Sequence, residues 1–473
     1  MGNTTTRIKL FLRDVALKWN RVRKSPKTLL SNPASIFMVL SAVFGLSMMI
    51  ALPLFEAPDE PVHFYRAYQV GEGKVIGETY NNVSGGYVRP AVEGNYDAGP
   101  EELPETFIPF PSSVIYSPLG YLPQAAGIDL GRLIDPSVRT MAYIGRLFNL
   151  ATYIVLVSLA IKIAKKGKWV YAVVGLFPIA IQQAASLSTD VMSMGIAFIA
   201  IAYIHSLFYS KSIARRQIVI LVLLAIGLGL TKQTNLIFLL PAIFIPTRLY
   251  GSWRSKLLLT SAIIIAGIIA AVGWYGAVIA SDINTDYASY LQLSDVKPVR
   301  QVKHMMNNPF EFLGTLFRSF VFEGFKSAAT PDFYLVSAYG FFSWFTYKLP
   351  LPFIALGYSL LLLSLLHSKD NKEHKDTINN GLAIIQFATF LLSVLGIAVA
   401  LYIVWTPVGS PQISGIQGRY FIPLIPLLIP ICGWLGKFVS VKFAKELYLG
   451  FLVAAISTIN LTAMLAITYR WFY

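Results

Sequence analysis

Long apolar runs separated by short polar segments dominate the chain from residue 35 onward. Several of these runs reach or exceed the roughly 20 residues that a helix needs to cross a hydrocarbon core of about 30 Å. They lack the alternation of apolar and polar positions that is typical of a membrane barrel strand. The pattern therefore predicts an all-α polytopic membrane protein with about 11 transmembrane helices. We expect the spans at residues 35–54, 141–163, 169–187, 190–209, 217–231, 235–247, 257–280, 349–366, 379–404, 419–436 and 447–467.

The polar connections differ in charge from one side of the predicted bundle to the other. Alternate connections are short and basic, so all of these fall on the same side. Because cytoplasmic loops carry an excess of Lys and Arg, we expect this side, and the N-terminus with it, to be cytoplasmic. The basic residues are Lys165, Lys166 and Lys168; Lys211, Arg215 and Arg216; Arg248, Arg254 and Lys256; Lys369, Lys372 and Lys375; and Lys437, Lys442 and Lys445.

Two long segments fall on the opposite side, which we expect to be extracytoplasmic. The first, residues 55–139, holds twelve of the chain's 24 Asp and Glu residues but only five Lys or Arg. It is too rich in aromatic residues and proline for a disordered linker. The second, residues 281–348, contains a basic stretch at 297–304 that is typical of a helix facing lipid headgroups. Both segments are therefore predicted to carry interfacial helices.

We expect a single transmembrane domain over residues 34–473, preceded by a cytoplasmic interfacial helix in residues 1–33. Residues 1–30 carry eight basic residues and one acid, with apolar residues at helical spacing, which is typical of a helix on an anionic leaflet. A cleaved signal peptide fits less well, because the apolar run that follows ends without a small-x-small site. Spans five and six are short and meet at residues 231–235, which predicts a turn below the membrane surface that lines a polar cavity.

Composition agrees with a membrane protein and excludes several classes of function. The 473 residues are 55% hydrophobic and 13% charged, with a mean hydropathy of +0.59, which is outside the range of soluble globular domains. The formal charge of +15 follows from the basic cytoplasmic connections, so it does not indicate a nucleic-acid partner. The single cysteine, Cys432, leaves no disulfide framework and no thiolate metal cluster.

The segment directly after the first span reads Ala-Pro-Asp-Glu-Pro-Val-His at residues 57–63. Pro61 suits the first turn of a helix that begins near Glu60. On such a helix Glu60, His63 and, with a slight offset, Asp59 point the same way, and a carboxylate there could deprotonate an acceptor hydroxyl. Alternatively, Asp59 caps the helix and His63 is merely interfacial. A divalent metal held by these three residues is a weaker possibility, since such triplets recur by chance.

Three cations are assigned to the extracytoplasmic half of the bundle, namely Arg146, Lys232 and Arg419. Charge at this depth is costly and usually functional. Arg offers a planar fork that matches phosphate oxygens, whereas Lys offers a point charge. The alternative is that these side chains reach lipid headgroups or pair with Asp190 or Glu323.

Polar residues also gather at the predicted outer ends of spans three and four. These are Gln182, Gln183, Ser186 and Asp190. Such groups suit sugar hydroxyls, but Gln and Ser are more commonly used for hydrogen bonds between helices. Asp190 could equally cap the fourth span.

Several motifs together resemble one protein family. They are Pro58-Asp59-Glu60-Pro61-x-His63, Tyr116-x-Pro118-x-x-Tyr121, Gly145-Arg146-x-x-Asn149, the stretch from Gln183 to Asp190, and Gly418-Arg419-Tyr420. This pattern resembles the bacterial membrane proteins of domain of unknown function 2142, from about the first span to the tenth. That family in turn resembles the GT-C superfamily of polytopic glycosyltransferases, which take sugars from polyprenyl-phosphate carriers.

The resemblance implies a GT-C-like architecture and a role for each site residue. Asp59 would be the base or acceptor-orienting carboxylate, with Glu60 as its neighbour, while Arg419 and Lys232 would hold the carrier phosphate. We accordingly expect catalytic residues at Asp59, Glu60 and His63. Substrate-binding residues are expected at Arg146, Gln183, Asp190, Lys232, Arg419 and Tyr420.

The leading hypothesis is a GT-C-type glycosyltransferase that moves a hexose or pentose in cell-envelope polysaccharide biosynthesis. Its donor would be a polyprenyl-phosphate-linked sugar, and its acceptor a glycan or lipid-linked molecule on the extracytoplasmic face of the bacterial cytoplasmic membrane. A flippase or transporter of lipid-linked saccharides is the alternative, because intramembrane charges can also line a translocation path. A non-catalytic assembly scaffold would explain the folded loop but not the buried cations.

Overall fold

The computed structural model describes residues 32–89, 96–97, 105–285, 295–322, 334–343, 347–367, 380–435 and 445–472. The interfacial helix expected in residues 1–33 falls outside these residues, apart from its last two positions. The basic stretches at 369–375 and 437–442 fall outside them as well.

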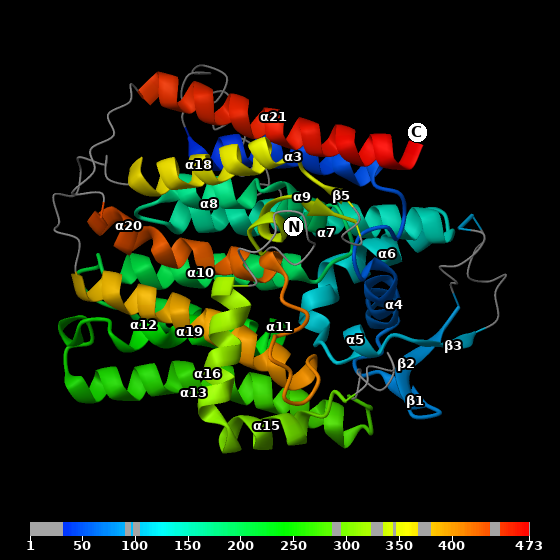
Figure 1. The fold of residues 1–473 in the computed structure, drawn as a ribbon, viewed down its shortest axis with the longest axis horizontal. Helices are drawn as coiled ribbons and strands as arrows, with labels where there is room; N and C mark the ends of the chain where they lie inside the picture. Colours follow the sequence, from blue (N-terminus) through cyan, green and yellow to red (C-terminus); the bar gives the residue numbers. More distant parts are fainter. Residues whose placement is uncertain are drawn as a thin grey trace, which may run out of the picture.

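Long helices lie side by side and form an elongated bundle (Figure 1). Within the described residues, six helices are long and apolar enough to cross a membrane. These are α3 (Pro33–Ala51), α7 (Val138–Ile163), α10 (Asp190–Leu207), α13 (Trp253–Ala280), α19 (Asn380–Val404) and α21 (Lys445–Phe472). The predicted all-α polytopic membrane fold is thus confirmed, whereas the number of about 11 spans stays a prediction.

Shorter helical segments occupy the remaining predicted spans. They are α8 (Lys168–Gly175), α9 (Pro178–Ala184), α11 (Arg215–Thr231), η3 (Gln233–Leu239), α12 (Leu240–Ile243), α18 (Leu351–His367), η6 (Gly418–Leu428) and α20 (Ile429–Leu435). A further short turn, η4 (Thr247–Leu249), precedes α13.

Three of these spans are interrupted rather than continuous α-helices. Between α8 and α9 the chain extends at Phe177, before a proline. Both η3 and η6 are 3₁₀ segments that precede a short α-helix, and η6 contains Pro423 and Pro426. Because proline has no N–H to donate, it breaks the regular helical ladder. The predicted turn at 231–235 is present, since α11 ends at Thr231 and Lys232 adopts an extended conformation.

One end of the bundle, which we term the α4 end, carries most of the segment predicted at 55–139 (right side of Figure 1). Its helices are α4 (Glu60–Gly71), α5 (Pro111–Val114), η2 (Pro118–Tyr121) and α6 (Leu122–Ile134). They accompany an antiparallel sheet of β1 (Glu78–Tyr80), β2 (Val83–Val88) and β3 (Thr106–Pro109), in which Gly85 pairs with Glu78 and with Pro109. The helices were expected, but the sheet was not.

The segment predicted at 281–348 forms a second set of short elements. They are α15 (Pro298–Asn307), α16 (Pro309–Phe317), the π-helical turn η5 (Arg318–Phe322), α17 (Tyr334–Tyr339), β4 (Phe341–Phe342) and β5 (Tyr347–Lys348). Lys297, Arg300 and Lys303 are exposed on or beside α15, as are Val299 and Met306. This mixture of exposed cations and apolar side chains agrees with the predicted interfacial helix.

Helix α7 occupies a central position in the bundle and packs against α3, α6, α8 and α10. Its apolar residues join the largest buried cluster, in which Tyr153 packs against Phe37 and donates a hydrogen bond to the Gly175 carbonyl at 2.6 Å. A second cluster lies under α4 and α6 and includes Phe64, Tyr68 and Tyr121. The end of α7 that is nearest α4 therefore lies between two packed cores, which fixes the surroundings of the residues described next.

Candidate functional site

The turn between α3 and α4 presents Asp59 directly before the first residue of α4. Asp59 has a φ of 62°, in the left-handed region, which Asp and Asn tolerate better than most other residues. Helix α4 begins at Glu60 with Pro61 in its first turn, as predicted. Asp59 occupies the N-cap position, but its side chain makes no capping hydrogen bond. The carboxylate is therefore directed to other partners.

Four charged side chains from distant parts of the sequence form a continuous line, which we term the charge chain. Arg419 Nη2 lies 3.3 Å from Asp59 Oδ2, and Arg419 Nε lies 4.0 Å from Asp190 Oδ2. Asp190 Oδ1 in turn accepts a hydrogen bond from Lys232 Nζ at 2.9 Å. The pairing of these cations with Asp190, stated above as an alternative, is thus present, while Glu323 lies outside the described residues.

The members of the charge chain differ in exposure. The side chain of Asp59 is 41% exposed, whereas that of Arg419 is 8% exposed. Asp190 and Lys232 lie between these values. The Tyr420 ring adjoins both cations, with Lys232 Nζ 5.1 Å and Arg419 Cζ 5.7 Å from its centroid. Cations at this distance are attracted to the face of an aromatic ring, so Tyr420 helps to hold Lys232 and Arg419 close to each other.

His63 lies on α4 beside the charge chain. Its Nδ1 atom is 2.8 Å from the Tyr121 hydroxyl. Burial lowers the pKa of His63, and the nearby negative charges of Asp59 and Asp190 oppose that shift. The imidazole is therefore neutral near pH 7, in a position where Tyr121 determines its orientation.

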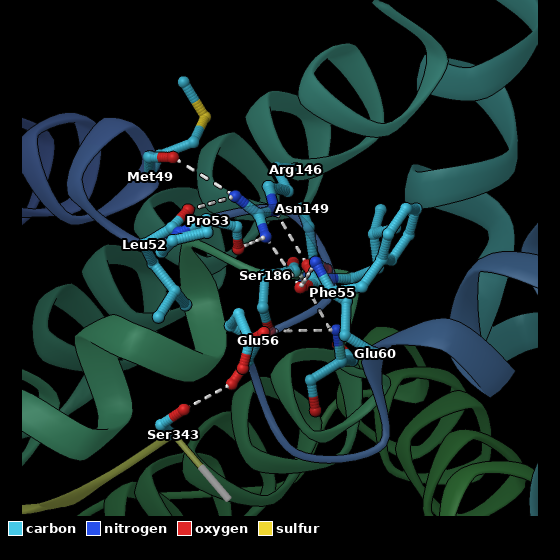
Figure 2. Close-up of polar contacts among 12 residues, drawn as sticks. Met49, Leu52, Pro53, Phe55, Glu56, Glu60, Arg146, Asn149, Ser186 and Ser343 are labelled. Atoms are coloured by element: carbon cyan, nitrogen blue, oxygen red, sulfur yellow. Dashed lines mark hydrogen bonds and ion pairs between the residues drawn. The ribbon is translucent and has the colours of Figure 1, made fainter. Parts of the chain in front are cut away.

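Glu60 and Arg146 face each other and form a buried ion pair (Figure 2). Arg146 Nε donates to Glu60 Oε1 at 2.7 Å, and Nη2 donates to Oε2 at 2.6 Å. The side chain of Glu60 is 1% exposed and that of Arg146 is 0% exposed. Both oxygens of Glu60 therefore already have partners, and solvent does not reach them.

Gln183 lies on α9, which packs against α3, α10 and α17. It is buried, and neither its amide nitrogen nor its amide oxygen has a hydrogen-bond partner within the described part of the chain. Gln182, next to it, is in the same situation. Leaving buried amides without partners is costly, so these groups have unused capacity for hydrogen bonding.

The three residues suggested as metal ligands do not converge. Asp59 contacts Arg419, Glu60 contacts Arg146, and His63 contacts Tyr121. In the ranges that the structure describes, no group of three or more His, Cys, Asp or Glu side chains is placed to hold a metal ion.

Two residues near the site were not among the predicted site residues. Tyr121 orients His63, and Asn149 donates hydrogen bonds to the turn before α10. Both belong to motifs noted in the sequence, and the spacing of Arg146 and Asn149 places them on one face of a helix. Their partners could not be identified from that spacing alone.

Comparisons with known proteins identify one family and two solved structures to which the chain is similar. A family described as predicted membrane protein, DUF2142, matches residues 98–428. A search of curated proteins finds no match. Among solved structures, the oligosaccharyltransferase of Archaeoglobus fulgidus matches with 10% identity and a TM-score of 0.39, in a form tethered to an acceptor peptide and in a complex with an inhibitory peptide and dolichol-phosphate. Each match covers 91% of this chain but only 55% and 56% of the solved chains, so the protein spans about half their length. The match to the family extends over most of the sequence, and the chain therefore belongs to the DUF2142 family of membrane proteins.

Proposed function

We propose that the protein is a membrane glycosyltransferase that moves a sugar from a polyprenyl-phosphate carrier to a hydroxyl of a cell-envelope glycan or lipid-linked acceptor. The observation that carries the proposal is the charge chain. In it a partly exposed carboxylate, Asp59, contacts Arg419, and Asp190 links Arg419 to a second cation, Lys232. Glycosyl transfer from a phosphate needs both kinds of group within reach of one substrate.

The proposed step uses the two ends of the charge chain differently. Asp59 accepts the proton of the acceptor hydroxyl as that oxygen bonds to the anomeric carbon of the sugar. The bond between the anomeric carbon and the carrier phosphate breaks, and its electron pair leaves with the phosphate oxygen. Arg419 and Lys232 stabilise the negative charge that develops on the phosphate.

Asp59 is a better candidate for the base than Glu60. A base must reach the hydroxyl that it deprotonates, and the side chain of Asp59 is 41% exposed. The side chain of Glu60 is 1% exposed and is bonded through both oxygens. For the same reason we assign Arg146 to Glu60 rather than to the substrate.

The other predicted site residues have supporting roles in this proposal. Asp190 holds Lys232 beside Arg419 through the contacts described above. His63 stays neutral and contributes a hydrogen-bonding ring next to Asp59. Gln183 offers an unpaired amide that can bind sugar hydroxyls.

The proposed location is the bacterial cytoplasmic membrane, with the N-terminus in the cytoplasm and the charge chain on the extracytoplasmic side. The basic connections support this orientation. For example, Lys165, Lys166 and Lys168 follow the end of α7 that is remote from α4. Because basic loops stay in the cytoplasm, the α4 end is assigned to the outside.

Binding of the product lipid offers a direct test of the phosphate-binding pair. The purified protein in lipid nanodiscs should bind a polyprenyl monophosphate, as measured by native mass spectrometry. Lys232→Met should weaken this binding by about tenfold or more, because a charge-assisted hydrogen bond contributes roughly 1.5–3 kcal/mol. Arg300→Gln, which removes an exposed cation on α15, is the matched control and should leave binding unchanged.

The same purified protein, placed in nanodiscs for transfer and in proteoliposomes for transport, distinguishes the two functions. Radiolabelled polyprenyl-phosphate hexoses and pentoses are incubated with an envelope glycan fraction, and label in the glycan is measured. Transfer of label supports the enzyme. Movement of intact lipid-linked sugar across a proteoliposome membrane, with no transfer from any donor, would instead identify a flippase and overturn the proposal.

A further inference from the structure

Helix α7 presents two buried polar side chains, Arg146 and Asn149, one turn apart on the same face. Besides Glu60, Arg146 bonds the chain where α3 ends. Its Nη1 donates to the carbonyl oxygens of Met49 and Leu52, at 3.2 and 2.9 Å, and its Nη2 donates to that of Pro53 at 2.9 Å (Figure 2). One guanidinium therefore fastens both ends of the turn that carries Asp59.

Glu60 extends this network to a second turn. Its Oε2 accepts a hydrogen bond from the Phe55 amide at 3.0 Å, within the turn between α3 and α4. Its Oε1 accepts one from the Leu187 amide at 3.1 Å. Leu187 belongs to the short turn that leads into α10, whose first residue is Asp190.

Asn149 holds that second turn directly. Its amide nitrogen donates to the carbonyl oxygens of Ser186 at 2.7 Å and Ser188 at 3.0 Å. Gln124 on α6 adds a hydrogen bond to the Ser188 carbonyl at 3.2 Å. The backbone two residues before Asp190 is thus fixed from two helices.

We infer that Glu60, Arg146 and Asn149 form a clamp whose role is to position the two carboxylates of the site, Asp59 and Asp190, relative to each other. Asp59 precedes Glu60 directly, and Asp190 follows the turn that Glu60 and Asn149 hold. The three are positioning residues: Glu60 and Arg146 contact each other and the protein backbone, and the amide nitrogen of Asn149 contacts the backbone.

The spacing of the carboxylates matters because Arg419 bridges them. Its guanidinium lies 3.3 Å from Asp59 and 4.0 Å from Asp190. A displacement of about 1 Å in either turn would exceed the reach of an ion pair on one side. That the clamp serves catalysis rests on the proposed function, but that it sets the distance between Asp59 and Asp190 does not.

The test measures the electrostatic surroundings of each carboxylate position without any substrate. Two reporters, Asp59→Cys and Asp190→Cys, are made separately in a Cys432→Ala background, which removes the only native thiol. Each is reacted with an anionic and a cationic methanethiosulfonate of similar size. Nearby cations favour the anionic reagent, and a unit charge at about 4 Å in water changes each rate by about fivefold.

The clamp is then weakened in both reporter proteins. Asn149→Leu keeps the size of the side chain and its neutral charge but removes the amide donor, and Arg146→Lys keeps the charge but loses the fork. The matched control is Asn460→Leu, because Asn460 is also buried in a helix and donates to a backbone carbonyl, that of Leu176, at 3.0 Å. Asn149→Ser, which retains a hydroxyl donor, replaces Asn149→Leu if that variant does not fold.

We expect Asn149→Leu to reduce the anionic preference at position 190 to less than about twofold while position 59 changes less, because Asn149 contacts only the second turn. Arg146→Lys should reduce the preference at both positions, and Asn460→Leu at neither. Unchanged preferences in folded Asn149 and Arg146 variants would overturn the inference, as would an equal loss in the Asn460→Leu control. Since no donor or acceptor is used, this outcome is independent of whether the protein transfers sugars.

Discussion

Glu60 and Asp59 are adjacent carboxylates in opposite surroundings, so replacing each by its amide should have opposite consequences. Glu60→Gln removes the only carboxylate that contacts Arg146 among the described residues. Asp59→Asn removes one end of the charge chain, where the side chain is 41% exposed. We therefore predict that Glu60→Gln lowers the stability of the fold, whereas Asp59→Asn abolishes activity with little effect on stability.

The magnitude follows from burial. With both side chains at 1% exposure or less, Glu60→Gln leaves an uncompensated guanidinium in the interior, which costs roughly 3–5 kcal/mol. A partly exposed ion pair contributes about 0–1 kcal/mol. Asn also tolerates the left-handed conformation at position 59, so no backbone strain is added. The two variants should therefore differ by at least about 2 kcal/mol in free energy of unfolding.

The assay is denaturant unfolding in mixed micelles, followed by tryptophan fluorescence. A double variant, Glu60→Gln with Arg146→Met, isolates the pair, because removing both charges avoids the isolated cation. The double variant should retain some loss, since the carbonyls of Leu52 and Pro53 lose their donor. Its loss should nevertheless be smaller than the sum of the single losses by about 2 kcal/mol. Strict additivity, or equal stability of the Glu60→Gln and Asp59→Asn proteins, would refute this reasoning.

Three further predictions concern neighbouring groups. His63 has a lowered pKa because it is buried, so as the pH falls the imidazole is protonated in the unfolded chain at a higher pH than in the folded protein. The free energy of unfolding of the wild type should therefore fall by up to about 1.4 kcal/mol per pH unit below about pH 6.5. Unfolding measurements between pH 7.5 and 5.5 should show that the His63→Gln protein lacks this part of the decline. Lys232→Met and Asp190→Asn should each destabilise the protein, with a double-variant loss about 1 kcal/mol smaller than their sum; a fully additive result would argue against their ion pair. Burial lowers the pKa of Arg66 to about 10, and its guanidinium donates a hydrogen bond to the Val75 carbonyl at 2.7 Å, which holds the segment after α4. Arg66→Met should therefore speed tryptic cleavage after Lys74, and an unchanged cleavage rate would contradict this role.

The sequence was sufficient to predict the membrane class, the turn at residues 231–235 between the fifth and sixth spans, and the start of α4. These features depend on local patterns, namely apolar run length, short paired runs and a proline in a first turn. The residues of the charge chain were also identified in the sequence. The pairing of the cations with Asp190 was only an alternative interpretation, and the contact between Asp59 and Arg419 was not predicted, because the two residues are separated by 360 positions.

The parts that could not be predicted depend on contacts between distant segments. Glu60 looked equivalent to Asp59 in the sequence, since its partner Arg146 is 86 positions away. The small sheet was missed because its strands are short and β2 contains two glycines, Gly85 and Gly86, which weaken any strand signal. A local pattern identifies a polar residue at a depth where charge is costly, but only the fold distinguishes a substrate-facing charge from a buried structural pair.

The central claim is that Asp59 is the base of a glycosyl transfer. It is tested most directly by transfer of label from polyprenyl-phosphate sugars to an envelope glycan fraction in nanodiscs, with wild type compared with Asp59→Asn at matched folded protein. We predict that Asp59→Asn lowers the transfer rate by about 10²–10⁴-fold while its unfolding free energy stays within about 1 kcal/mol of wild type. Full transfer by folded Asp59→Asn protein would contradict the account.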